Sequence, residues 1–173
     1  REANAESHYR LNAMLSSSST LNAVMCHRQW AKSTILSYVD PTHQIAYCPR
    51  DDVRFLAIIS ESQQQSQNHI ARISNCVEYN PRFRDLYGNL AYGRKWGNKE
   101  IVTKNDVRAI ALGTGQRLRG VIEVGGRRPT RTYIDDFESE KNAMTIEARR
   151  QNKRWLYSVV VPFKDKDLGQ IFM

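Results

Sequence analysis

The amino-acid sequence predicts a layered α/β domain with a mostly parallel sheet. Short apolar segments alternate with helical segments along the 173 residues, and no internal repeat is present. Such alternation is typical of parallel strands that are connected through helices. The length suits one domain with a substantial core.

The first elements follow from hydrophobic pattern and from helix breakers. Residues 1–15 are expected to form a helix, and the serine-rich run at 16–20 a flexible connection. "LNAVMC" at 21–26 is apolar and predicts an interior strand. The segment 32–39 is expected to form a helix that ends before Pro41.

The middle of the chain is predicted to continue the alternation. "QIAYC" at 44–48 is expected to form the next strand, and residues 51–77 a long helix, although its centre is wholly polar. Residues 80–97 are expected to be irregular and rich in aromatic side chains. Two alternating strands at 100–104 and 107–112 surround an Asn-Asp pair, which predicts a hairpin.

The last third predicts two more strands around a basic helix. "TRTYI" at 130–134 is expected to form a strand that ends at an Asp-Asp pair, and residues 142–157 a basic helix. Glycine- and arginine-rich loops precede that strand. The final "GQIFM" is expected to be a strand cut short. Because the chain also begins without methionine, we expect a fragment of a longer protein.

Composition narrows the class of protein. Lys and Arg outnumber Asp and Glu by 26 to 18, a net charge of +8, which suits a polyanion such as DNA or simply a basic soluble chain. No apolar run reaches the ~18 residues of a membrane helix, and no signal-peptide pattern opens the sequence. Cys26, Cys48 and Cys76 lack C-x-x-C spacing, which argues against a zinc site and fits a reducing compartment.

One short motif resembles a phosphate-binding loop. The run Lys-Ser-Thr at 32–34 matches the end of G-x-x-x-x-G-K-[ST], a motif in which backbone N–H groups surround phosphates. Cys26 and Ala31 occupy the two glycine positions, so the match alone is poor. The alternative is a basic turn before a helix.

A second motif supplies the carboxylates that phosphoryl transfer needs. "TYIDDFE" places Asp135, Asp136 and Glu138 after a strand, where open α/β sheets bind ligands. A magnesium ion and a carboxylate that orients water are the usual requirements of such chemistry. A solvated acidic turn is the alternative, but both motifs together favour a nucleotide site. The ends of the strands at 21–26 and 130–135 are then expected to lie side by side.

The ordered set of motifs resembles the ATPase domain of the large terminase subunit of tailed bacteriophages, the motor that packs DNA into a prohead. The matching segments are "RQWAKST", "NPRFRDLYG", "KWGNKEIVTKN", "ALGTGQRLRG", "RRP" and "YIDDFESEKN". This resemblance implies a three-layer P-loop NTPase fold (RecA/ASCE-like), truncated at its carboxyl end. It divides the chain into an N-terminal helix and serine-rich linker at 1–20 and an incomplete ATPase domain at 21–173. The coupling motif and nuclease domain of the family would follow Met173.

The resemblance also implies roles for the loop residues. Large terminases often have a deviant loop of the form R-x-x-[GA]-K-[ST], which Arg28, Ala31, Lys32 and Ser33 match. Arg28 would act in cis on the γ-phosphate, although a surface charge is the alternative. Lys32 would reach the phosphates, Ser33 would bind Mg²⁺, and Ala31 would need a negative φ. The implied nucleotide-binding residues are Arg28, Gln29, Trp30, Ala31, Lys32, Ser33 and Thr34, the last beginning the helix.

The acidic residues receive two roles. Asp135 would be a Mg²⁺ ligand together with Ser33, and Asp136 would orient the attacking water because of its position. Glu138 is the close alternative for that second role.

Arg119 would lie beside the nucleotide. Tyr92 and Trp96 could stack on bases, although anchoring of a loop is the favoured interpretation.

The expected cofactors are ATP and Mg²⁺, and the expected main partner is double-stranded viral DNA. Family resemblance adds the portal protein, the small terminase subunit and a homo-oligomeric ring, in the host cytoplasm on the prohead and without membrane contact. Two alternatives stay open. One is a basic nucleic-acid-binding module without catalysis, and the other is a different P-loop ATPase, such as a helicase-like enzyme.

Overall fold

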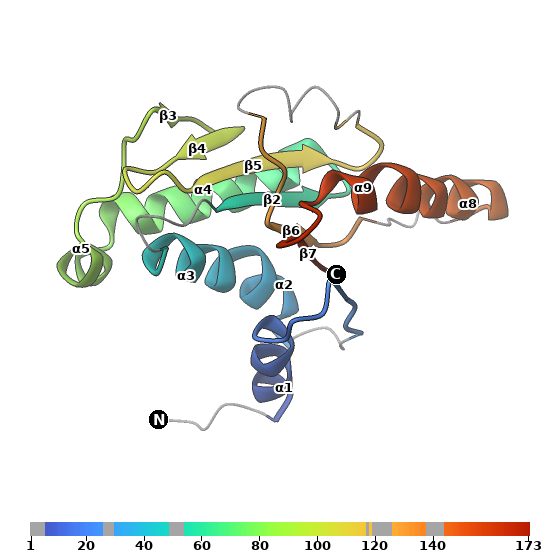
Figure 1. Cartoon of the computed structure of the whole chain (residues 1–173), viewed down its shortest axis with the longest axis horizontal. Coiled ribbons are helices and arrows are strands. Elements are labelled where there is room, and N and C mark those ends of the chain that lie inside the picture. Colours follow the sequence, from blue (N-terminus) through green and yellow to red (C-terminus); the bar gives the residue numbers. More distant parts are fainter. Residues whose placement is uncertain (1–5, 26–29, 49–53, 117, 119–125, 138–143) are drawn as a thin grey trace.

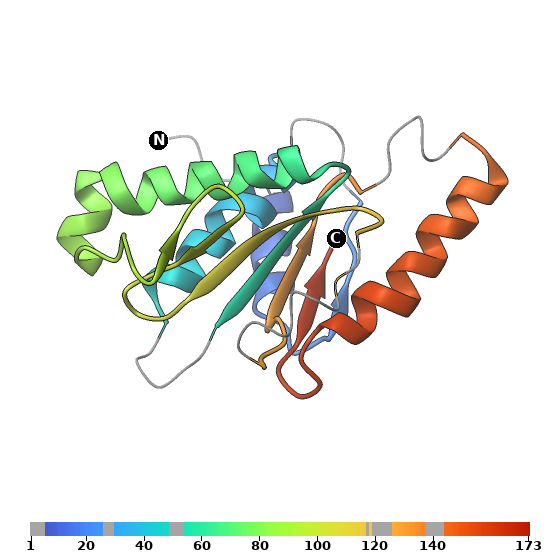
Figure 2. The same cartoon turned by 90° about the horizontal axis from the view of Figure 1, so that it is seen from above.

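A seven-stranded mixed sheet forms the centre of the molecule in the computed structural model (Figures 1 and 2). The structure describes residues 6–25, 30–48, 54–116, 118, 126–137 and 144–173. The strand order is β1-β7-β6-β2-β5-β4-β3, and the first five strands pair in parallel. The strands are β1 (Leu21–Asn22), β2 (Phe55–Ser60), β3 (Lys95–Trp96), β4 (Glu100–Val102), β5 (Arg108–Gly113), β6 (Arg131–Ile134) and β7 (Gln170–Phe172). The predicted α/β class and mostly parallel sheet are confirmed.

Helices cover both faces of this sheet. Leu36, Ile45 and Ile70 belong to a core cluster on one face, and Leu156 and Val160 to a cluster on the other. In Figure 1, α5 and α8 lie at opposite ends of the molecule. The helices are α1 (Glu6–Leu15), α2 (Lys32–Thr34), η1 (Ile35–Val39), α3 (Asp40–Ala46), α4 (Gln63–Tyr79), α5 (Pro81–Tyr87), α8 (Ile146–Trp155), η2 (Leu156–Val160) and α9 (Val161–Phe163).

The predicted helix at 51–77 is wrong in its first part. Residues 55–60 form β2, whose six residues are all buried between β5 and β6. A continuous apolar run is typical of an interior parallel strand and cannot be told from a buried helix by periodicity alone. The helix α4 begins only after Ser62, which forms a capping box with Gln65.

The predicted strand at 44–48 is wrong, and so is the predicted helix end before Pro41. The segments α2, η1 and α3 follow one another without a break, so helix continues to Ala46. The segment η1 is a π-helix in which the Asp40 N–H donates to the Ile35 carbonyl. A wider turn directly before the proline lets the helix pass a residue that has no N–H. Pro162 follows η2 in the same way.

The predicted interior strand at 21–26 is wrong in its position. The strand β1 pairs with β7 alone and forms an edge of the described sheet. Its Leu21 is 44% exposed, and Met25 beyond it is 98% exposed. The strand β7 lies between β1 and β6. The prediction that the strands at 21–26 and 130–135 end side by side is therefore also wrong. Residue 26 lies outside the described residues.

Other predicted elements are confirmed. The helix within 1–15, the strands within 130–134 and 169–173 and the hairpin of β4 and β5 are present. The prediction of irregular chain at 80–97 is wrong in part, because the segment holds β3 and also α5, which begins at Pro81 after the capping residue Asn80. The basic helix starts at Ile146 among the described residues and continues through η2 into α9.

The serine-rich connection is attached to the sheet. Ser17 Oγ donates to Asn22 Oδ1 at 3.1 Å, and Gln170 Nε2 donates to the Ser17 carbonyl at 2.7 Å. These contacts link the end of α1 to β1 and β7. Within the described part of the chain, no helix is both long and apolar enough to span a membrane.

Candidate active site at the carboxyl end of β6

Asp135 brings the two predicted halves of the site together. It follows β6 and is 3% exposed. Ser33 Oγ donates to Asp135 Oδ1 at 3.0 Å, although the two residues lie 102 positions apart. Lys32 Nζ lies 3.7 Å from the same oxygen. The first two residues of α2 therefore meet the first carboxylate after β6, as the sequence predicted.

The second carboxylate oxygen of Asp135 faces two other residues. Ser37 Oγ donates to Asp135 Oδ2 at 3.2 Å, and the Ser37 side chain is fully buried in η1. His69 Nε2, from α4, lies 3.9 Å from the same oxygen. Each oxygen of Asp135 thus has its own set of partners, and all of them come from helices on one face of the sheet.

His69 is uncharged at neutral pH. Burial lowers its pKa from the ordinary value of 6.5, and this outweighs the opposing attraction of Asp135. Lys32 therefore supplies positive charge beside Asp135. A partly buried pair of this kind is screened less by salt than an exposed pair.

Two residues at the site have left-handed backbone conformations. Ala31 has a φ of 57° and Asp136 a φ of 48°. The expectation of a negative φ at Ala31 is wrong. The left-handed residue precedes α2 directly, and its carbonyl accepts a hydrogen bond from the Ile35 N–H at 2.8 Å. Glycine would adopt this conformation without the steric cost that alanine has, so Ala31 occupies a position that suits the motif's glycine.

The structure describes only some of the other loop residues that were predicted to bind nucleotide. The helix begins at Lys32, as in the predicted segment 32–39, so Thr34 lies within it and does not begin it. Trp30 is 41% exposed. Arg28 and Gln29 lie outside the described residues.

Of the other predicted residues near the site, the structure describes Asp136 but not Glu138 or Arg119. Asp136 is exposed directly after Asp135, and its carbonyl accepts from the Glu61 N–H at 3.1 Å. Glu138 and Arg119 lie outside the described residues. The structure thus brings together Lys32, Ser33 and Asp135, with Asp136 adjacent in the chain.

The aromatic pair Tyr92 and Trp96 lies away from this site, at β3. Trp96 Nε1 donates to Glu78 Oε2 at 3.2 Å, and the rings of Tyr92 and Trp96 are 5.4 Å apart. The Tyr92 hydroxyl also bonds to Glu78, which raises the pKa of Tyr92 to about 12. These contacts hold β3 and the segment before it on α4, in line with the favoured interpretation as a loop anchor.

Polar groups continue along the carboxyl edge of the sheet beyond Asp135. Thr114, after β5, donates to the carbonyls of Ser60 and Phe137 at 3.1 and 3.2 Å. The hydroxyl of Ser60, at the end of β2, is buried and has no hydrogen-bond partner among the described residues. The ends of three neighbouring strands therefore carry polar groups at the edge where open α/β sheets bind ligands.

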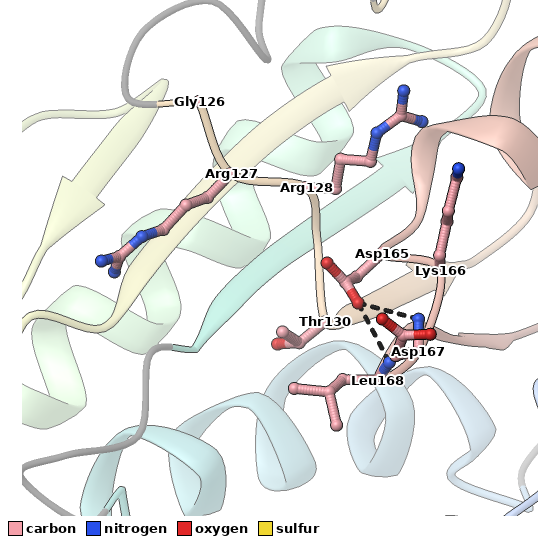
Figure 3. Close-up of a pocket in the computed structure, with 8 residues that line it drawn as sticks. All are labelled: Gly126, Arg127, Arg128, Thr130, Asp165, Lys166, Asp167 and Leu168. Atoms are coloured by element: carbon pink, nitrogen blue, oxygen red, sulfur yellow. Dashed lines mark hydrogen bonds between the residues drawn. The ribbon is translucent and has the colours of Figure 1, made fainter.

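A hollow of about 460 Å³ lies at the other end of β6. Its lining residues are Gly126, Arg127, Arg128, Thr130, Asp165, Lys166, Asp167 and Leu168 (Figure 3). The carboxylate of Asp165 accepts hydrogen bonds at 3.0 Å from the N–H groups of Asp167 and Leu168, drawn as dashed lines in Figure 3. These bonds, the one from Leu168 most, lower the pKa of Asp165. Its carboxylate therefore stabilises a turn, and we assign the chemistry to the Asp135 cluster instead.

The donors at Asp135 suit magnesium. Among the described residues, no group of three or more His, Cys, Asp and Glu side chains could hold a metal ion. Mg²⁺ is usually bound by one or two protein oxygens together with phosphate oxygens and water. A serine hydroxyl and a carboxylate 3.0 Å apart provide such oxygens.

Sequence reasoning missed Ser37 and His69. Ser37 follows Ser33 by four positions and interrupts an apolar helical run, and that spacing could have revealed it. His69 lies directly before Ile70 in α4. Its proximity to Asp135 follows from the packing of α4 against the sheet, which no sequence pattern indicated.

Comparison with known proteins does not extend this description. No model of a known protein family matches the chain, and a search of curated proteins finds no match either.

Proposed function

We propose that this chain binds ATP with Mg²⁺ and hydrolyses it. The observation that carries this proposal is the contact of Ser33 with Asp135 across 102 residues, with Lys32 beside it. A lysine and a hydroxyl at a helix start, facing a carboxylate after a parallel strand, form the two halves of a P-loop nucleotide site. The left-handed Ala31 supports the same proposal, since the loop motif has glycine there.

The residues divide the work of phosphoryl transfer. The Lys32 ammonium would contact the phosphates, and the Ser33 hydroxyl and the Asp135 carboxylate would hold the metal. Mg²⁺ held by Ser33 and Asp135 would supply the positive charge that offsets the negative charge developing on the phosphates. Asp136 would orient the attacking water, with Glu138 as the alternative, and Arg28 would contact the γ-phosphate.

We propose further that the chain is the ATPase domain of a phage large terminase with a RecA/ASCE-like fold. This larger role rests on the ordered motifs and includes translocation of double-stranded viral DNA on the prohead in the host cytoplasm. The portal protein, the small terminase subunit and a ring of copies would be its partners. Exposed cations on the described α8 support a polyanionic partner: Arg149, Arg150, Lys153 and Arg154.

Hydrolysis of ATP with and without double-stranded DNA tests the proposal. We expect Mg²⁺-dependent phosphate release that falls by about 10²–10³-fold in Lys32→Gln, because a charge that stabilises the transition state is lost. Lys104→Gln is the matched control, since Lys104 is exposed on the hairpin. DNA binding without hydrolysis would favour the basic binding module instead. Strand separation would favour a helicase-like enzyme.

A further inference from the structure

We propose that Ser37 is a positioning residue that holds Asp135 by its second carboxylate oxygen. This inference rests on the proposed function. The Ser37 hydroxyl donates to Asp135 Oδ2 at 3.2 Å, and its side chain is fully buried. The contact joins η1 to the end of β6 across 98 residues, so local chain geometry does not produce it.

The two oxygens of Asp135 have partners of different kinds. Oδ1 faces Ser33 and Lys32, the two groups that the proposed function assigns to the metal and the phosphates. On ligand binding, Lys32 would turn to the phosphates, and Ser33 and Asp135 Oδ1 would hold the metal. The Ser37 hydroxyl cannot turn to the ligand in this way, because its side chain is fully buried. It therefore keeps Asp135 oriented while Oδ1 turns to the metal.

The helix that carries Ser37 is fixed to β6 at a second point. Asp40, three positions after Ser37, accepts hydrogen bonds from the Tyr133 hydroxyl at 2.5 Å and from Arg131 Nη1 at 2.9 Å. Both donors belong to β6, the strand that ends at Asp135. Two attachments of one helix to one strand hold the serine and the carboxylate in a fixed relation, which is what a catalytic carboxylate needs.

Ser37 is the hydrogen-bond donor to Oδ2 among the described residues. His69 lies 3.9 Å from this oxygen, which is beyond hydrogen-bond distance. Hydrogen-bond partners of metal-binding carboxylates fix the orientation of the ligand, and their removal typically lowers metal affinity by about 10–100-fold. This range sets the size of the effect that the experiment must detect.

The test measures binding of a non-hydrolysable ATP analogue by calorimetry, with and without Mg²⁺, for the full chain. We expect Ser37→Ala to weaken binding in Mg²⁺ by about 10–100-fold and to leave binding without Mg²⁺ unchanged. The matched control is Ser66→Ala. Ser66 is also fully buried, but its hydroxyl donates to the Leu112 carbonyl at 2.6 Å, away from Asp135.

A purely structural role of Ser37 would give a different result. Ser37→Ala and Ser66→Ala would then both lower the melting temperature and leave the Mg²⁺ dependence of binding unchanged, which would overturn the inference. If Ser37→Ala fails to fold, Ser37→Cys replaces it in the test, because the thiol is of similar size and only a weak hydrogen-bond donor. We expect the Mg²⁺ dependence of analogue binding by Ser37→Cys to lie between those of the wild-type protein and of a variant without a donor. A Mg²⁺ dependence equal to that of the wild-type protein would overturn the positioning role.

The outcome also separates this inference from the proposed function. If the wild-type protein binds the analogue and Ser37→Ala behaves as Ser66→Ala does, only the positioning role fails. If the wild-type protein binds no nucleotide in either condition, the proposed function fails and the role of Ser37 fails with it.

Discussion

Tyr133 and Asp40 form a buried hydrogen bond of 2.5 Å that joins β6 to the helix carrying Lys32 and Ser33. Burial first, and then the charge of Asp40, raise the pKa of Tyr133 well above its ordinary value. The tyrosine therefore stays protonated and acts as donor. Arg131 forms an ion pair with the same carboxylate oxygen at 2.9 Å, so Asp40 is held by two residues of one strand.

The first prediction concerns this buried ion pair. Arg131→Met should lower the free energy of unfolding by about 3–5 kcal/mol, because the charge of Asp40 is then left buried without its cation. Denaturant unfolding measures the loss. Arg10→Met removes the exposed pair of Arg10 with Glu6 and should change nothing measurable. Equal effects of the two variants would show that the Asp40 pair is not buried in solution.

The second prediction concerns the left-handed residue before α2. Ala31→Gly should raise the free energy of unfolding by about 1 kcal/mol, because glycine adopts a φ of 57° without steric cost. The matched control, Ala71→Gly within α4, should lower it by about 1 kcal/mol. Thermal unfolding checks the opposite signs. A loss of stability in both variants would contradict the left-handed conformation at Ala31.

The third prediction concerns pH and the hairpin. Burial tends to raise the pKa of Glu100, but Lys95 and Arg108 outweigh it and lower the pKa below 4.5. Glu100 accepts from Arg108 Nε at 2.8 Å and from Lys95 Nζ at 2.5 Å. A lowered carboxyl pKa stabilises the folded protein above the unfolded value, and this stabilisation is lost as pH falls through the folded value.

Glu100→Gln should therefore cost about 1–3 kcal/mol at pH 7. The difference from the wild-type protein should shrink below pH 4.5. Unfolding at a series of pH values measures it, with the exposed Glu147→Gln on α8 as control. A difference that persists unchanged at low pH would mean that packing, and not charge, is responsible.

The fourth prediction separates the two acidic roles at the end of β6. Asp136→Asn should bind ATP normally and hydrolyse it about 10²–10⁴-fold more slowly, because an orienting acid acts mainly in the transition state. Asparagine also tolerates the φ of 48° at this position. Asp135→Asn should instead weaken Mg²⁺-dependent binding.

Glu138→Gln is the comparison for Asp136→Asn and should be milder. Single-turnover hydrolysis, measured beside equilibrium binding, distinguishes these outcomes. If Glu138→Gln abolishes turnover while Asp136→Asn retains it, the water-orienting role belongs to Glu138. If neither substitution affects turnover, the acidic cluster is only a turn.

The sequence predicted that Lys32, Ser33 and Asp135 lie together, but not all of the strands and helices that connect them. The meeting was predictable because each motif follows from local chemistry: cations at a helix start and acids after a strand. The strand β2 was missed because its buried apolar run has no alternation, and because a helix follows it after two residues.

Three other features could not be predicted from the local sequence. The continuation of helix through Pro41 depends on a π turn, which propensities do not predict. The left-handed Ala31 contradicts the local preference of alanine, and the surrounding structure must over-determine it. Ser37 and His69 reach Asp135 through the tertiary packing of η1 and α4, which local sequence patterns do not indicate.

The π turn at Ile35–Val39 lets this helix hold one extra residue without changing the directions in which its two ends face. Each residue in an α-helix advances the direction of its side chains by about 100°. Asp40 is fixed to β6 on one side of the turn, and Ser33 meets Asp135 on the other. A π turn absorbs one residue more than an α turn, so deleting one residue from 35–39 should close it into an α turn and leave Lys32 and Ser33 facing the carboxylate. In a helix without this turn, the same deletion would rotate them by about 100° and separate the two halves of the site.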